Sequence, residues 1–108
     1  MSGQTRRQKI EAMLGDDPSD TFLRYSLAME LQKEGEHVES LSRFEELMAD
    51  QPPHVPAFFM AAKLLLELDR RDDARAKLRS GIEEARRQDN SHAASEMAEL
   101  LTAIGPLG

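Results

Sequence analysis

The sequence contains no cysteine and no tryptophan, and only 5% of its 108 residues are aromatic. The absence of cysteine excludes a disulfide framework, a thiolate nucleophile and a cysteine-ligated zinc site. Hydrophobic residues make up 40% of the chain and charged residues 31%, which is typical of a globular protein and not of a disordered one. We therefore expect a single domain that spans residues 1–108.

Positive charge and long apolar runs are also in short supply. The chain has 14 Lys and Arg against 20 Asp and Glu, and its bases are mostly interleaved with acids, whereas nucleic-acid binding relies on clustered basic residues. The longest apolar block, residues 55–66, is interrupted by Lys63 and is too short to cross a bilayer. No apolar run of adequate length follows the early basic residues, so no secretory signal is visible. These features predict a cytoplasmic protein with no nucleic-acid and no membrane partner.

Groups that could carry catalysis or hold a metal are scattered along the chain. His37, His54 and His92 lie far apart, and no pair has the spacing of a helical metal site. No glycine-rich phosphate loop is present. Adjacent carboxylates such as Glu83 and Glu84 point to different sides of a helix, which predicts a solvated surface. The sequence therefore predicts a protein that is not an enzyme and uses no cofactor and no metal.

The sequence does contain helical periodicity throughout, and no segment alternates as a strand would. A helix start signal is formed by Asp17, Pro18, Ser19 and Asp20, in which an Asx-type cap precedes a proline of the first turn. Helix breaks are expected at Gly35, Pro52, Pro53, Gly105 and Pro106. The pattern predicts six helices, at about residues 5–14, 22–33, 37–49, 56–68, 73–87 and 92–104.

The sequence also matches itself when it is shifted by 34 residues. A consistent shift of this size indicates a structural repeat, because apolar, small and proline positions fall on their own kind over most of the chain. The coinciding pairs include Pro18 with Pro52, Tyr25 with Phe59, Ala28 with Ala62, Leu31 with Leu65 and Phe44 with Leu78.

This period and pattern resemble the tetratricopeptide repeat family, whose unit is a hairpin of two helices. The family's first-helix motif falls on Arg24, Leu27, Ala28 and Leu31, and then on Phe58, Ala61, Ala62 and Leu65. Its second-helix motif falls on Ser40, Phe44 and Pro52, and then on Ala74 and Leu78. The chain departs from the family at Arg24, which replaces an aromatic residue, and at Leu31 and Leu65, which replace tyrosine. It also departs at Arg86, which replaces the second proline. The helix that contains Arg86 should therefore run on longer than usual.

The resemblance implies an all-α fold in which antiparallel helix hairpins stack into a right-handed superhelix. Its repeats would cover about residues 21–54 and 55–88, with a half-repeat helix at 5–14 and a capping helix at 92–104. Small residues at Ala28, Ala62, Ser40 and Ala74 would let the paired helices approach closely. Gly81, in the middle of a helix, would mark a close contact with the last helix.

The resemblance also implies that the first helices of successive repeats line a concave groove that binds peptides or helices. The predicted groove residues are Phe22, Tyr25, Met29, Gln32, Phe59, Lys63 and Leu66. Because most of them are apolar, an apolar or amphipathic segment is favoured over the acidic chaperone C-termini that some family members bind. The helix at 57–68 is apolar almost all round, and such a helix is normally covered on several sides.

The sequence leaves three occupants open for this surface. The first is a peptide or helix of another protein, the second is another copy of the chain, and the third is the chain's own helix at residues 5–14. We therefore predict a non-catalytic protein–protein interaction module, with a self-assembling homodimeric scaffold as the alternative.

Overall fold

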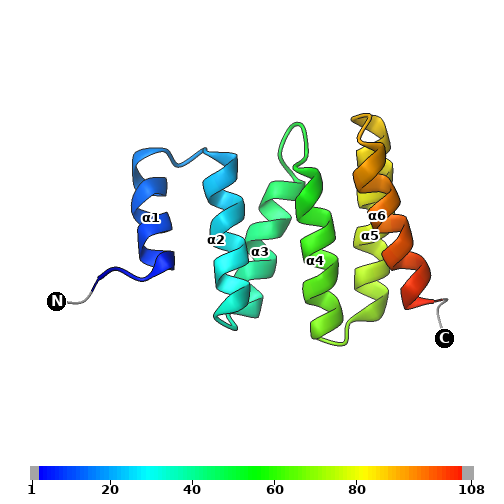
Figure 1. The fold of residues 1–108 in the computed structure, drawn as a ribbon, viewed down its shortest axis with the longest axis horizontal. Helices are drawn as coiled ribbons and strands as arrows, with labels where there is room; N and C mark the ends of the chain where they lie inside the picture. Colours follow the sequence, from blue (N-terminus) through cyan, green and yellow to red (C-terminus); the bar gives the residue numbers. More distant parts are fainter. Residues whose placement is uncertain (1–2, 106–108) are drawn as a thin grey trace.

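The computed structural model describes residues 3–105, which form six helices and no strand (Figure 1). The helices lie side by side in chain order, so the molecule is elongated, measuring 51 × 29 × 19 Å. Its Cα radius of gyration of 14.8 Å exceeds the ~13 Å of a compact domain of this length. The helices are α1 (Arg6–Asp16), α2 (Thr21–Lys33), α3 (His37–Met48), α4 (Val55–Glu67), α5 (Arg71–Arg87) and α6 (Ser91–Ile104). The prediction of a helical solenoid is confirmed; Pro106, one of the predicted breaks, lies outside the described residues.

The first two helices begin at side-chain caps. In α1 the Gln8 backbone N–H donates to the Thr5 hydroxyl at 3.1 Å, and the Gln8 side chain accepts from the Thr5 N–H at 2.9 Å, forming a capping box. The Asp20 carboxylate caps α2 by accepting from the Leu23 N–H at 2.9 Å. The predicted start at Asp17 is wrong, because the Asp17 N–H still bonds to α1 and Asp17 is the C-terminal cap of that helix.

Three helices end in the left-handed backbone conformation. Gly35 follows α2 with φ of 82°, which confirms the predicted stop. Asp69 and Asp89 hold the corresponding places after α4 and α5, each with φ of 59°. Aspartate tolerates this region better than most residues. In each case the next amide reaches back into the helix, as in Arg70 N–H to Leu65 O at 2.8 Å, and so satisfies a terminal carbonyl.

The core is divided into three clusters, each shared by helices that are neighbours along the chain. This is the arrangement expected of a solenoid, in which every unit is stabilised by the units next to it. The first cluster joins α1 and α2, the second α2 to α4, and the third α4 to α6. Their main buried members are Ile10, Leu27 and Leu31; Ala28, Phe44, Leu47, Ala57, Ala61 and Leu64; and Val55, Phe58, Ala62, Leu65, Leu78, Ile82 and Met97.

The small residues lie at the helix contacts where the repeat pattern predicts them. Ala28, Ala62 and Ala74 are fully buried. Ser40 is fully buried as well, and its hydroxyl donates to the Ala28 carbonyl at 2.7 Å. A serine therefore fits the close approach of α2 and α3, because its only polar group has a partner across the contact.

Gly81 lies at a close contact between α5 and its two neighbouring helices. A Cβ atom at this position would lie 2.5 Å from the Met97 sulfur in α6 and 2.6 Å from the Phe58 Cβ in α4. The predicted contact of Gly81 with the last helix is confirmed, and α4 packs against Gly81 as well. As the repeat pattern also predicts, α5 is long, with 17 residues against 12 in α3.

Two charged residues of α5 are buried, and for Glu84 this contradicts the expected solvated surface. Glu84 is 7% exposed; it forms an ion pair with Arg87 and accepts from the Gln88 side chain at 3.0 Å. Arg75 is 3% exposed, and its Nε donates to the Gly105 carbonyl at 3.0 Å. Arg75 thereby ties the C-terminal end of α6 to α5.

Candidate functional site: the concave face of α2, α4 and α6

The six helices form two rows of unequal spacing. The backbones of α2 and α4, and those of α4 and α6, approach within 8 Å, whereas the backbones of α1, α3 and α5 do not approach one another as closely within residues 3–105. The side chains of Glu45 in α3 and Lys77 in α5 bridge the wider gap with an ion pair of 3.5 Å. The more closely spaced row lies on the inside of the curve. The concave face is therefore formed by α2, α4 and α6, and the outer row is formed by α1, α3 and α5.

The helix α1 does not cover this face. Within the described chain it contacts only α2, where Ile10 packs against Leu27 and Leu31. These two leucines point away from the side of α2 that carries Phe22 and Met29. The idea that residues 5–14 fill the groove is therefore wrong, and the reason is that α1 takes the place of an outer-row helix.

Two of the predicted groove residues are open to solvent on α2. Phe22 is 73% exposed and Met29 is 36% exposed. They are seven residues apart, which places them on one face of the helix, two turns from each other. The N-terminal end of the concave face therefore presents uncovered apolar side chains.

Two further predicted residues, Tyr25 and Phe59, meet at a pocket in the middle of the concave face. The pocket has a volume of about 100 Å³ and lies where α2, α4 and α6 converge. The other residues that line it are Val55, Pro56, Ala93, Glu96 and Met97. Of the seven predicted groove residues, Tyr25 and Phe59 line this pocket, and the other five do not.

The remaining predicted residues have partners within the chain. The Gln32 side chain donates to Glu67 at 3.0 Å and so links α2 to α4. The Lys63 ammonium lies 4.5 Å from the centre of the Phe59 ring, in a cation–π contact that holds this ring in place. Leu66 lines a separate depression of about 340 Å³ beside Leu100 and Ile104, where α6 partly covers it.

The sequence did not identify the contribution of α6 to this face. The start of α4 follows the start of α2 by 34 residues, but α6 starts 36 residues after α4 because α5 is longer. A search at one fixed shift therefore misaligns α6. The spacing of Ala93, Met97 and Leu100, four and three residues apart, was the signal that this helix also has a packed face.

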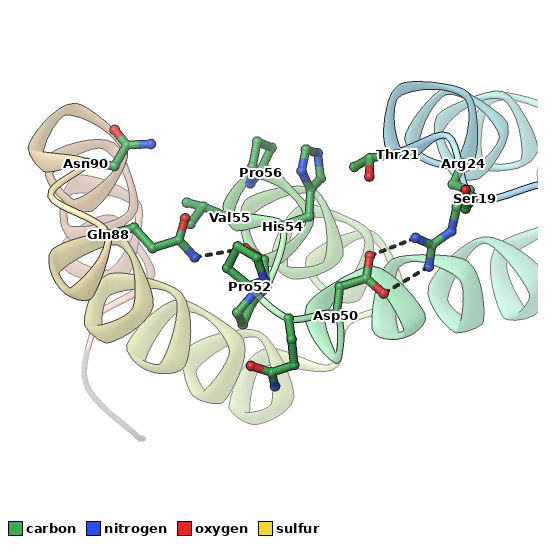
Figure 2. Close-up of a pocket in the computed structure, with 12 residues that line it drawn as sticks. Ser19, Thr21, Arg24, Asp50, Pro52, His54, Val55, Pro56, Gln88 and Asn90 are labelled. Atoms are coloured by element: carbon green, nitrogen blue, oxygen red, sulfur yellow. Dashed lines mark hydrogen bonds and ion pairs between the residues drawn. The ribbon is translucent and has the colours of Figure 1, made fainter.

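A second, polar depression lies where the concave face meets the loops at the N-terminal ends of α2 and α4. Figure 2 shows Arg24 reaching from α2 to Asp50, in the connection after α3, with two hydrogen bonds of 2.7 and 3.2 Å. The bond to Arg24 lowers the pKa of Asp50, and the same bond raises the pKa of Arg24. The arginine that replaces the family's aromatic residue thus fastens α2 to the loop before α4.

His54, the residue before α4, connects the polar depression to the apolar pocket. Its ring lies edge-on to Tyr25, with 4.9 Å between the ring centres. Its Nε2 atom is buried and has no hydrogen-bond partner within residues 3–105. Burial lowers the pKa of His54 below its usual 6.5, the charge of Asp50 opposes this, and that of Arg24 adds to it.

We expect this histidine to make the protein less stable as the pH falls below about 6.5. The unfolded chain binds a proton at His54 with a pKa near 6.5, while the folded chain binds it only at lower pH. At a pH between these two pKa values, His54 is protonated in the unfolded state but not in the folded state. The free energy of unfolding should therefore fall as the pH is lowered through this range. Urea denaturation at pH 7.5 and pH 5.5 measures the difference.

The variant His54→Gln is the matched control, because glutamine does not titrate. The other two histidines are present in both proteins, so the loss of stability at low pH should be smaller in the variant by the contribution of His54 alone. The Arg24–Asp50 pair does not interfere, because a carboxylate with a lowered pKa loses its contribution only below about pH 4. The same pH dependence in both proteins would contradict the prediction.

Within the described part of the chain, no three or more His, Asp or Glu side chains gather where they could hold a metal ion. None of the helices that the structure describes has the length and apolar character needed to cross a bilayer.

The comparisons with known proteins agree on one family. A sequence model of the tetratricopeptide repeat matches residues 31–104. The solution structure of a tetratricopeptide repeat domain protein from Salinibacter ruber is 35% identical, with 84% of this chain and 92% of that chain covered and a TM-score of 0.77. A crystal structure of a tetratricopeptide repeat domain protein from the same organism is 34% identical, with 83% and 100% covered and a TM-score of 0.73. No curated protein matches the chain.

Proposed function

Because the chain belongs to the tetratricopeptide repeat family, we propose that it acts by holding a segment of another protein on the concave face of α2, α4 and α6. The family consists in general of non-catalytic protein–protein interaction modules. The finer part of the proposal concerns this chain alone: the segment lies across the three inner helices and is held mainly by apolar contacts.

The observation that carries the proposal is the exposure of Phe22 on the same face as an apolar pocket. Phe22 is 73% exposed at one end of the concave face, and the pocket between Tyr25 and Phe59 lies farther along it. Burying a phenylalanine side chain that is exposed to water gains roughly 1.5–3 kcal/mol of free energy, which a partner covering Phe22 would supply to binding. Exposed apolar surface of this kind is typical of interaction sites, and aromatic side chains are frequent anchors within them.

We expect the double variant Phe22→Ser/Met29→Ser to lose its partner while keeping its fold. Phe22 is 73% exposed and Met29 is 36% exposed, so their removal should lower the free energy of unfolding by no more than about 1–2 kcal/mol. Loss of two apolar contacts from an interface should weaken binding by at least about tenfold. Affinity capture from the source lysate, with circular dichroism on each protein, measures both effects.

Val38→Ser is the matched control, because Val38 is 86% exposed on α3, in the outer row. Proteins captured by the wild type and by this control, but not by the double variant, support the concave face. Equal capture by all three proteins contradicts it.

The same proteins also test the homodimer. Light scattering after size-exclusion chromatography should show a concentration-independent monomer for the wild type if the partner is another protein. A dimer that the double variant converts to a monomer would favour the self-assembling scaffold instead.

A further inference from the structure

We infer that the segment held on the concave face inserts one branched aliphatic side chain into the pocket between Tyr25 and Phe59, with a lysine or arginine next to it on the α6 side. This inference rests on the proposed function and narrows its partner to a basic amphipathic segment.

The size of the pocket selects the inserted side chain. The pocket has a volume of about 100 Å³. An enclosed cavity that accepts a benzene ring measures ~150 Å³, so this smaller pocket favours an aliphatic side chain over an aromatic one. A leucine or isoleucine side chain, with four carbons, fits the space and replaces water that meets mostly apolar walls.

The walls of the pocket are well suited to hold such a group. Tyr25 is fixed from behind by the edges of Phe44 and His54, whose ring centres lie 5.9 and 4.9 Å from its own. Phe59 is held by Lys63. The floor includes Met97, which is fully buried in the cluster of α4, α5 and α6. A pocket with fixed walls costs little entropy to fill, so one inserted side chain contributes most of its burial energy to binding.

The charge beside the pocket selects the neighbouring residue. Glu96 is the one charged residue among the described residues that line the pocket, and it is half-exposed. The Glu96 carboxylate lies 3.6 Å from Nε2 of His92, which is almost fully exposed. The rest of α6 adds Glu99 and contains no lysine or arginine. A cation of the partner that arrives on this side meets an acidic wall and is shielded from water as the segment docks.

The same asymmetry sets the direction of the segment. Lys63 lies on α4 and its charge faces the Phe59 ring, so the basic side chain of the partner is repelled from α4 and drawn toward α6. Phe22 and Met29 lie on α2, at the opposite side of the pocket. The segment therefore places further apolar residues over α2, its aliphatic anchor in the pocket, and its basic residue over α6.

A peptide-display selection on the immobilised chain tests this chemistry with a library of random peptides as the probe. The enriched peptides should share a leucine, isoleucine or valine with a lysine or arginine within four residues. Synthetic copies of these peptides are then titrated against three variants, with circular dichroism on each protein. In Ala93→Leu the pocket is filled, in Glu96→Lys its charge is reversed, and Glu83→Lys makes the same charge change on α5, away from the pocket.

Binding should fall by at least about tenfold in Ala93→Leu and by about fivefold in Glu96→Lys, and should stay within about twofold in Glu83→Lys. Glu96→Lys keeps the test valid if Ala93→Leu disturbs the fold, because the side chain of Glu96 is half-exposed. Raising the salt concentration should shrink the effect of Glu96→Lys and leave that of Ala93→Leu.

Failure of this inference can be told apart from failure of the proposed function. Enriched peptides that are acidic, or that bind Glu96→Lys as well as they bind the wild type, overturn the inference alone if Phe22→Ser/Met29→Ser still weakens them. Peptides that bind this double variant unchanged, or the absence of any enriched sequence, overturn both.

Discussion

Replacing Phe44 with alanine should lower the free energy of unfolding by about 3–5 kcal/mol. Phe44 is fully buried between α2, α3 and α4, in a cluster with Ala28, Leu47 and Ala61. Its neighbours include fully buried alanines, whose short side chains cannot extend into the space that the ring would leave. The helices are already in close contact through these alanines, so the backbone cannot collapse onto the cavity either. The variant should therefore lose the transfer free energy of the ring and should in addition carry the cost of an unfilled cavity.

Urea denaturation of the variant measures this change, and Val38→Ala is the matched control on the same helix. Val38 is 86% exposed, so its truncation should cost no more than about 0.5 kcal/mol. A domain of this size has a total stability of about 5–15 kcal/mol, and Phe44→Ala should leave it marginal. A loss below about 1 kcal/mol would show that the ring is not enclosed as described. The pocket should also loosen, because Phe44 supports the Tyr25 ring from behind.

Gly81→Ala should lower the free energy of unfolding by about 1–3 kcal/mol, even though alanine favours a helix over glycine by about 1 kcal/mol. The new methyl group would lie 2.5 Å from the Met97 sulfur and 2.6 Å from the Phe58 Cβ. The methionine side chain can move, but a Cβ atom moves only with its backbone. The methyl group therefore has to push α4 and α5 apart at the point where the third core cluster is closed.

Gly15→Ala provides the opposite result within the same protein. Gly15 lies in the last turn of α1, and a Cβ atom there would meet nothing within 4 Å. Only the helix preference remains, so this variant should be more stable than the wild type by about 0.5–1 kcal/mol. Thermal unfolding measures both effects: the melting temperature should fall in Gly81→Ala and rise in Gly15→Ala. A stabilising Gly81→Ala would mean that α4 and α5 can separate without loss.

The sequence predicted the helices and their close contacts because both follow from local rules. Apolar periodicity and breaks such as Gly35 locate the helices, and the shift of 34 residues locates Ala28 and Ala62 at the contacts. The contact at Gly81 was predicted from a glycine in the middle of a helix. Local rules failed where two of them competed. Asp17 and Asp20 can both cap a helix, and the choice depends on which residue still bonds to α1.

The pocket could be predicted only in part, because it depends on a helix outside the regular repeat. Tyr25 and Phe59 occupy equivalent repeat positions, so the shift identifies both. Glu96 lines the same pocket from α6, whose offset of 36 residues removes it from the register. Arg75 and Glu84 were missed for a different reason: a charged residue in a helix is usually solvated, and only the tertiary structure shows that the ends of α5 and α6 enclose them.

The linear packing of the helices has a mechanical consequence. Every helix packs extensively against the helices next to it in the chain, whereas the backbones of helices more than two places apart do not approach within 8 Å in residues 3–105. A displacement at one end of the row is therefore passed on only from neighbour to neighbour. Slight rotations between successive helices add up along the row and change the curvature of the inner surface without opening any part of the core.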